Sequence, residues 1–297
     1  MKFIPWLHFL WKVPLCGLIF FIGFIPGGQL ASWLGLPVPG LPAGADQATF
    51  TQYTLLVNLI LAACLAALSL GISGSFLSRW LILFFFTWIT YGVNNYLEAS
   101  IFSTMSAASV YSVVLYLPAS LFCSAAVAWL FPVRTQSISF PELARTFFAG
   151  RTVGNWAWRL FAAFLAFPLV YLFFGRLIAP IVLPYYRAGV NELTLPGWHQ
   201  ILPMAALRSL LFLLACLPIL ITWRYSNGRL FLTLSLALFL FVGGLAMLYA
   251  IWLVPVLRIT HTLEILADEV VYTAALILLL RKPAAQPEAE QIPLPAH

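Results

Sequence analysis

Apolar segments of membrane-spanning length follow one another along the chain and are separated by short polar stretches. An α-helix needs about 20 residues to cross the hydrocarbon core of a bilayer, and eight of the segments approach or exceed that length. The pattern therefore predicts an all-α fold, a polytopic transmembrane helix bundle whose eight spans cover residues 8–27, 53–72, 80–100, 108–131, 158–180, 201–223, 230–252 and 260–280.

The composition agrees with a membrane protein and leaves no segment for a soluble domain. Hydrophobic residues make up 63% of the 297 residues, charged residues make up 8%, and the mean hydropathy is +0.98. The first apolar segment follows Lys2 and has some features of a cleaved signal peptide, but it carries motifs that recur later in the chain. We therefore expect it to be retained as a helix.

The basic residues predict the orientation of the bundle. With eight crossings, one side of the membrane receives most of them, and the positive-inside rule makes that side cytoplasmic. We expect a location in the cell (inner) membrane, with both termini in the cytoplasm. The basic residues that set this orientation account for most of the net charge of +6, so no nucleic-acid partner is expected. The residues on this side are Lys2, Lys12, Arg79, Arg134, Arg145, Arg151, Arg159, Arg224, Arg229, Arg281 and Lys282.

Short motifs recur in the two halves of the chain. The sequence 28–37, which begins Gly-Gln-Leu and ends Leu-Pro, is echoed at 175–184, and Trp11-Lys12 is echoed by Trp158-Arg159 at the same offset. Chance similarity between Leu-, Phe- and Gly-rich segments is the alternative. An even number of helices in each half predicts a parallel repeat about an axis along the membrane normal.

The repeat implies four regions. We expect an N-terminal four-helix half at 1–132, a cytoplasmic linker at 133–157, a C-terminal four-helix half at 158–281 and a disordered tail at 282–297. In the linker, Ser139, Pro141 and Glu142 form a helix start, and Gly150 forms a stop. They predict a short helix at 140–149 that lies in the headgroup plane.

The last span carries an unusual density of ionisable residues. At about 100° per residue, one helical face receives Arg258, His261, Glu264, Asp268, Glu269 and Tyr272. An ionisable group at membrane depth costs on the order of 2.5 to 3.5 kcal/mol, so such groups face a partner or a water-filled cavity and mark functional sites. We expect His261, Glu264 and Asp268 to act as titrating groups or as a general base.

Other polar residues fall in the same outer half of the membrane. Glu98 and Asn95 end the third span, Arg176 ends the fifth, and Arg208 lies about two turns into the sixth. Together they predict a polar cavity that opens outward, which the Pro-rich segment 29–52 and the segment 184–199 could cover. The predicted substrate-binding residues are Arg258, Arg208, Arg176, Glu98, Asn95 and Tyr272.

Three kinds of chemistry fit these residues. His261 and Glu264, spaced i, i+3, could bind a divalent metal or activate water. The arginines could bind a carboxylate or phosphate through their guanidinium forks. Alternatively, the charges could form buried ion pairs that only fix the helix register.

These chemistries lead to three hypotheses of function. The first is a permease or flippase-like protein that binds and translocates an anionic or lipid-linked small molecule. The second is an intramembrane enzyme, with or without a metal, that acts on a lipid. The third is a non-catalytic subunit of a membrane complex, with membrane lipid and other membrane proteins as partners. The sequence leaves open whether the protein is an enzyme, and a divalent metal is the only cofactor it suggests.

Overall fold

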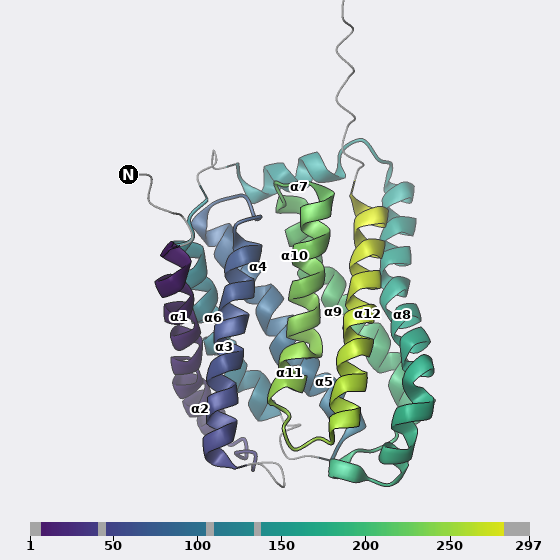
Figure 1. Cartoon of the computed structure of the whole chain (residues 1–297). Helices are drawn as coiled ribbons and strands as arrows, with labels where there is room; N and C mark the ends of the chain where they lie inside the picture. The colour runs from purple at the N-terminus through teal and green to yellow at the C-terminus, as the bar shows by residue number, and fades with distance from the viewer. Residues whose placement is uncertain (1–6, 41–45, 105–109, 134–137, 282–297) are drawn as a thin grey trace, which may run out of the picture.

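The computed structural model describes residues 7–40, 46–104, 110–133 and 138–281, which form a bundle of roughly parallel and antiparallel helices (Figure 1). The first half contains α1 (Leu7–Ile22), α2 (Phe24–Trp33), α3 (Gln47–Ser69), α4 (Phe76–Thr87), the π-helical turn η1 (Trp88–Val93), α5 (Asn94–Phe102) and α6 (Val110–Leu130). Because α1–α2 and α4–η1–α5 each form one continuous pass, this half crosses the bundle four times.

The second half repeats this order of elements. It follows α7 (Phe140–Phe148) and contains α8 (Val153–Arg187), the 3-10 turn η2 (Val190–Glu192), α9 (Trp198–Thr222), α10 (Asn227–Phe239), the π-helical turn η3 (Leu240–Gly244), α11 (Leu245–Tyr249) and α12 (Pro255–Leu280). In Figure 1, α1 begins and α12 ends at the same end of the bundle, and α7 lies across that end. We call this the α7 end.

Each predicted span corresponds to a helical pass, and the protein is a multi-pass membrane protein. Seven of the described passes are long and apolar enough to cross a membrane. The eighth, α12, has 26 residues and runs the height of the bundle beside α8 and α10 (Figure 1), but it includes Arg258, Glu264, Asp268 and Glu269. These charged residues lower its hydropathy, and they are also the basis of the candidate site.

The helix starts follow local capping chemistry. The side chain of Asp46 accepts hydrogen bonds from the first-turn amides of α3, and Ser75 and Ser226 cap α4 and α10 in the same way. In α7, Ser139 and Glu142 form a capping box that confirms the short helix predicted in the linker.

Several helices extend beyond the predicted spans, among them α8 and the first pass. The structure continues α8 to Arg187, although residues 184–187 were expected to lie in a loop, and the helix includes Pro180 and Pro184. Proline disfavours but does not forbid a helix, and here the extra turns pack as a wall of the cavity described below. The first pass continues as α2 to Trp33 after a break at Gly23.

Corresponding positions of the two halves make similar contacts. Lys12 Nζ donates to the carbonyl of Leu130 at 2.6 Å, and Arg159 Nη1 donates to the carbonyl of Leu279 at 2.6 Å. In each half, therefore, a cation of the first pass binds a carbonyl at the C-terminal end of the last pass. Each cation also lies over the ring of the tryptophan that precedes it.

The halves meet in a symmetrical backbone contact at the α7 end. Ile72 and Trp223 form an isolated antiparallel bridge. The amide of Ser73 donates to the carbonyl of Thr222 at 2.9 Å, and the amide of Arg224 donates to the carbonyl of Gly71 at 3.0 Å. A rotation that exchanges the loop after α3 with the loop after α9 would exchange these two hydrogen bonds, as expected beside a pseudo-twofold axis.

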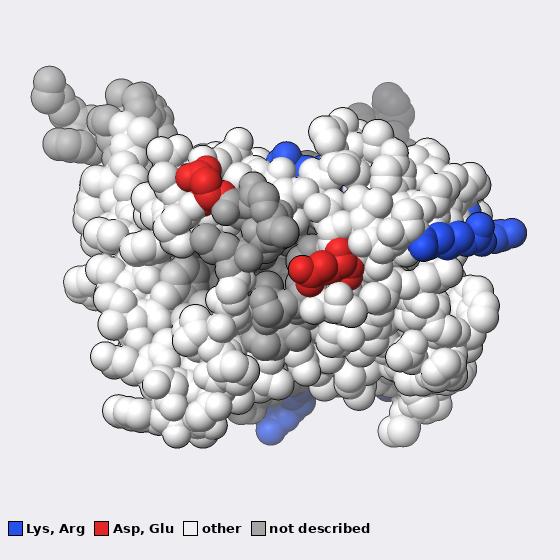
Figure 2. Space-filling view, turned by 90° about the horizontal axis from the view of Figure 1, so that it is seen from below, with Lys and Arg blue, Asp and Glu red and all other residues white. Residues whose placement is uncertain are grey.

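Charged side chains are distributed unequally between the two ends. Figure 2 views the end opposite α7, where uncharged residues dominate and few acidic or basic side chains appear. Most of the described basic residues lie in the helix ends and connecting segments near the α7 end: Lys12, Arg79, Arg145, Arg151, Arg159, Arg224, Arg229 and Arg281. This is the sidedness expected from the sequence.

Candidate functional site

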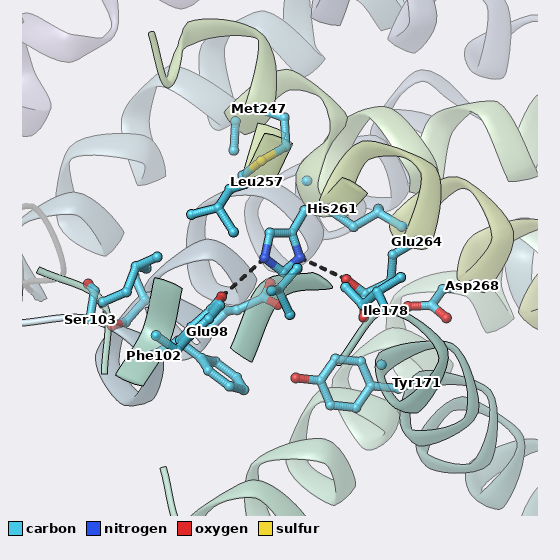
Figure 3. Close-up of a pocket in the computed structure, with 18 of the residues that line it drawn as sticks. Glu98, Phe102, Ser103, Tyr171, Ile178, Met247, Leu257, His261, Glu264 and Asp268 are labelled. Atoms are coloured by element: carbon cyan, nitrogen blue, oxygen red, sulfur yellow. Dashed lines mark hydrogen bonds and ion pairs between the residues drawn. The ribbon is translucent and has the colours of Figure 1, made fainter. Parts of the chain in front are cut away.

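A cavity of about 540 Å³ lies in the half of the bundle away from α7. Its walls come from α5, α8, α9, η3–α11 and α12, and residues 193–197 of the loop before α9 close part of it. Most lining residues are apolar. The ionisable side chains among them are Glu98, Tyr171, Arg176, Tyr186, Arg208, Tyr249, His261, Glu264, Asp268 and Glu269, several of which are drawn in Figure 3.

A hydrogen-bonded chain of three side chains connects α8 to α12. His261 Nδ1 lies 2.8 Å from Glu264 Oε2 (Figure 3), and His261 Nε2 lies 3.2 Å from the hydroxyl of Tyr186. With the carboxylate as acceptor, Nδ1 carries the proton and Nε2 accepts from Tyr186. The i, i+3 spacing places His261 and Glu264 on one face of α12, so the carboxylate fixes the tautomer and orientation of the ring.

A glycine on α8 lies next to this carboxylate. A Cβ atom at Gly175 would lie 3.4 Å from Glu264 Oε1, which is an ordinary van der Waals contact, so α8 passes close to the acid at this position. In the first half, a glycine packs against backbone atoms instead. A Cβ at Gly27 would lie 2.3 Å from the carbonyl oxygen of Leu115 on α6. Close backbone packing thus brings α2 against α6, whereas α8 and α12 hold an acidic side chain between them.

Arg208 of α9 is buried and already has partners. Only 3% of the residue is exposed. Its Nε donates to Asn94 Oδ1 at 2.7 Å, and its Nη2 lies 3.4 Å from Glu98 Oε2. The guanidinium also lies 5.1 and 5.0 Å from the ring centroids of Phe167 and Tyr171. Charge pairing and cation–π contact together offset the cost of burying this cation.

The π-helical turns help to build the Arg208 site. Asn94 follows η1, and its Nδ2 donates at 3.0 Å to the carbonyl of Val242 in η3. A π turn displaces carbonyls from the regular i to i−4 ladder, and such turns often occur at functional sites. Arg208 is therefore oriented by an amide that is itself held by the other half of the chain.

Asp268 and Glu269 form the end of the cavity nearer to α7. Asp268 is 4% exposed and lies one turn beyond Glu264 on α12, and Glu269 is fully buried. Neither oxygen of Glu269 has a hydrogen-bond partner, and Oδ1 of Asp268 has none. Buried carboxyl oxygens without partners are rare, because losing hydration without a replacement hydrogen bond is costly.

Seven of the nine predicted site residues line this cavity: Asn95, Glu98, Arg176, Arg208, His261, Glu264 and Asp268. Arg258 does not line it, because its guanidinium donates to the carbonyls of Met247 and Leu248 at the end of α11. Tyr272 does not line it either. Its ring packs beside Phe167 and Phe212 within the core.

Several cavity residues were not predicted. Glu269 was placed on the polar face of the last span but not in the site. Tyr171 carries no signal beyond its place on one face of an apolar helix, and Gly175 was singled out only as part of the repeated motif. Tyr186 was assigned to a loop, and Asn94 is a second-layer residue whose role depends on a contact with a distant segment.

One of the two loops that could cover the cavity contributes to its lining. Leu193, Leu195 and Pro196 line the cavity, whereas no described residue of the segment 29–52 does. This loop is fixed at several points. Asn191 and Glu192 have positive φ angles of 53° and 60°, a conformation that Asn tolerates and Glu rarely adopts, and Asn191 Nδ2 donates to the carbonyl of Trp252 at 2.9 Å.

The described residues offer little support for a metal centre. Among residues 7–40, 46–104, 110–133 and 138–281, no three His, Cys, Asp or Glu side chains are grouped so that they could hold a metal ion. The predicted ligands, His261 and Glu264, are hydrogen-bonded to each other. A catalytic zinc usually has three protein ligands, and this pair supplies two.

Comparison with known proteins adds no further constraint. No protein family, no curated protein and no solved structure matches this chain. The assignment of function therefore rests on the cavity and the residues that line it.

Proposed function

We propose that this protein binds a lipid-linked or other amphiphilic small molecule in the cavity and moves it across the membrane. The observation that carries the proposal is the combination of apolar walls with a cluster of buried ionisable side chains, contributed by helices of both halves. Ionisable residues inside a membrane bundle are costly and usually lie on a substrate or ion pathway.

The size and position of the cavity support this proposal. A volume of about 540 Å³ falls within the range of small-molecule sites. Helical repeats are common in transporters, whose substrate sites lie near the bilayer midplane between the repeats. Here α5 belongs to the first half, and α8, α9, α11 and α12 belong to the second. The proposed location is the cell membrane with both termini in the cytoplasm, on the basis of the basic residues near the α7 end.

The charge of the lining argues against an anion as the preferred ligand. Four carboxyl groups and two guanidinium groups line the cavity. Of the two arginines, Arg208 is paired with Glu98, and Arg176 is exposed on α8. The lipid-linked part of the sequence-based hypothesis is therefore retained, and its anionic part receives little support.

The binding step can be tested by identifying what co-purifies with the protein. Ala246 lines the cavity, so Ala246→Trp should fill it, whereas Leu278→Trp places the same side chain on a 78% exposed surface of α12. Mass spectrometry of the purified proteins should find a small molecule in the wild type and in Leu278→Trp but not in Ala246→Trp. Equal amounts in all three proteins would contradict binding in the cavity.

Translocation needs a second measurement with the same variants. The co-purified molecule, reconstituted with the protein in liposomes, should cross the membrane faster with the wild type than with Ala246→Trp. Binding without accelerated crossing would remove the transport part of the proposal. It would leave a binding protein, for example a subunit whose ligand or partner is held by the same cavity.

One observation favours an enzyme as a second candidate. In the chain Tyr186–His261–Glu264 a carboxylate orients an imidazole whose other nitrogen faces a hydroxyl group in the cavity. This is the arrangement of a general base that takes a proton from a hydroxyl or a water. An intramembrane enzyme should convert its lipid substrate in detergent, without any gradient, and His261→Gln should abolish conversion. A co-purified molecule that stays unchanged on incubation with the wild type would exclude this candidate for that molecule.

A further inference from the structure

We propose that the α7-side end of the cavity is a cation site, in which Asp268 and Glu269 bind the ammonium or other cationic group of an amphiphilic ligand. This inference rests on the proposed binding function and adds the chemical class of the ligand. It reverses the sign of charge expected from the sequence alone, where the arginines suggested an anion.

The other two acids of the cavity already have partners. Glu98 pairs with Arg208 at 3.4 Å, and Glu264 pairs with His261 at 2.8 Å. Asp268 and Glu269 are left, and three of their four carboxyl oxygens have no hydrogen-bond partner. Arg208 is within electrostatic range of both acids, but its Nε and Nη2 are directed to Asn94 and Glu98.

The unpartnered oxygens belong to side chains that line the cavity. Glu269 has no exposed surface and Asp268 has 4%, so bulk water does not hydrate them, yet both are lining residues. A buried carboxyl group of this kind is satisfied either by protonation or by a partner that enters from the cavity. A cationic group is the partner that satisfies two adjacent carboxylates at once.

The surroundings favour an organic cation over a metal ion. The described residues contain no group of three metal-binding side chains, and two carboxylates alone supply few ligands for a divalent ion. The walls of the cavity are largely aromatic and aliphatic, with Phe167 and Tyr171 at the level of Arg208 and Trp198, Tyr249 and Trp252 toward the end opposite α7. Aromatic rings attract organic cations through their π faces, and apolar walls accommodate the rest of an amphiphile.

Two probes of nearly equal size and opposite charge test this inference. Tetraphenylphosphonium is a lipophilic cation and tetraphenylborate is a lipophilic anion. Binding of each would be measured by equilibrium dialysis against the full-length protein in nanodiscs of phosphatidylcholine, with protein-free nanodiscs to subtract partition into lipid. The wild type should bind the cation at least about tenfold more tightly than the anion.

Variants assign the preference to the two acids. Asp268→Asn together with Glu269→Gln should lower the affinity for tetraphenylphosphonium at least about tenfold, because the charges are lost while side-chain shape is kept. Glu142→Gln, which removes an exposed carboxylate of α7, should leave the affinity unchanged. If the double variant does not fold, each single variant should give a smaller loss of affinity in the same direction. The comparison of the two probes on the wild type still tests whether the cavity prefers a cation.

The other outcomes are equally informative. Tighter binding of tetraphenylborate, equal binding of the two probes or no binding of either would overturn the cation site. Each of these results leaves the proposed function intact as long as a small molecule co-purifies with the wild type and not with Ala246→Trp. If the co-purification result also fails, the proposed function falls together with this inference.

Discussion

The side-chain amide of Asn94 donates a hydrogen bond to the backbone carbonyl of Val242 at 3.0 Å, and thereby joins the only two π-helical turns among the described residues. The two residues are 148 positions apart and belong to different halves of the chain. The same amide accepts a hydrogen bond from Arg208. One side chain therefore connects the halves and orients the buried cation of the cavity.

Loss of this amide should destabilise the protein. In Asn94→Leu, the Nε of Arg208 and the carbonyl of Val242 would both lose a buried partner, at a cost of about 2 to 4 kcal/mol. Thermal unfolding followed by tryptophan fluorescence should show a clear decrease in Tm. Asn95→Leu is the matched control, because Asn95 lines the cavity rather than holding Arg208, and its Tm should change little. Equal Tm values for the two variants would contradict the role of Asn94.

Close packing in the first half can be tested with a single methyl group. In Gly27→Ala the new Cβ would approach the carbonyl oxygen of Leu115 to 2.3 Å, and backbone atoms cannot move aside as a flexible side chain can. We expect a loss of about 1 to 3 kcal/mol in the free energy of unfolding. Gly154→Ala, in the first turn of α8 with open space around it, should be neutral or slightly stabilising.

The end of the bundle opposite α7 can be locked by a disulfide. Ser103 and Leu193 form an antiparallel bridge whose flanking hydrogen bonds, Thr104 to Glu192 and Thr194 to Phe102, make them a non-hydrogen-bonded pair. The Cα atoms of such pairs are about 4.5 Å apart, which suits a disulfide. The double variant Ser103→Cys with Leu193→Cys should therefore cross-link on mild oxidation, as measured by mass spectrometry of peptides.

The cross-link also tests how the proposed translocation works. The oxidised protein should still bind its ligand but should no longer move it, because the cover over the cavity cannot open, and reduction should restore movement. The four native cysteines are buried and free, so Ser103→Cys alone is a suitable control. Undiminished movement in the oxidised protein would show that the ligand takes another exit.

The linker helix should respond to pH through its capping box. The hydroxyl and the amide of Ser139 donate to Glu142, and these hydrogen bonds lower the pKa of the carboxyl group below its ordinary value. A carboxyl group whose folded-state pKa is lowered stabilises the fold above its unfolded-state pKa, and this contribution is lost as pH falls through the folded-state value. Amide exchange in α7, corrected for intrinsic rates, should show protection that declines over that range.

The matched variant isolates this effect. Glu142→Gln removes the titrating group but keeps a hydrogen-bond acceptor, so α7 should be less protected at neutral pH and should lose little more on acidification. An identical pH dependence in the variant and the wild type would show that another group controls the protection of α7.

The sequence predicted the passes well because their signal is the length of an apolar run. It also predicted which face of the last span is polar, because helical periodicity depends only on spacing. It could not predict the π turns, since one extra residue per turn leaves no pattern in an apolar segment. The extension of α8 through Pro180 and Pro184 was missed because packing against the cavity outweighed local propensity.

Two residues that were predicted to belong to the site lie outside the cavity, each for a different reason. Arg258 lies on the predicted face, but its guanidinium donates to carbonyls at the end of α11 and therefore does not reach the cavity. Tyr272 lies on the same face one turn too deep, where Phe167 and Phe212 enclose it. Periodicity gives the direction of a side chain, whereas partners on distant segments decide what it contacts.

The length of α8 links the site to the thickness of the surrounding bilayer. This helix has 35 residues, which is about 52 Å at 1.5 Å per residue, against a hydrocarbon core of about 30 Å. Its outer face is a continuous apolar stripe that includes Phe161, Leu165, Leu169, Phe173 and Leu177, and its inner face carries Tyr171, Gly175 and Tyr186 of the cavity. A helix longer than the core adapts by tilting, and the tilt increases as the bilayer becomes thinner. We therefore expect spin-label distances between α8 and α9 to change with the acyl-chain length of the lipid. Hydrophobic mismatch at the lipid-facing surface would then alter the width of the cavity. Constant distances would show that contacts with neighbouring helices alone hold α8 in place.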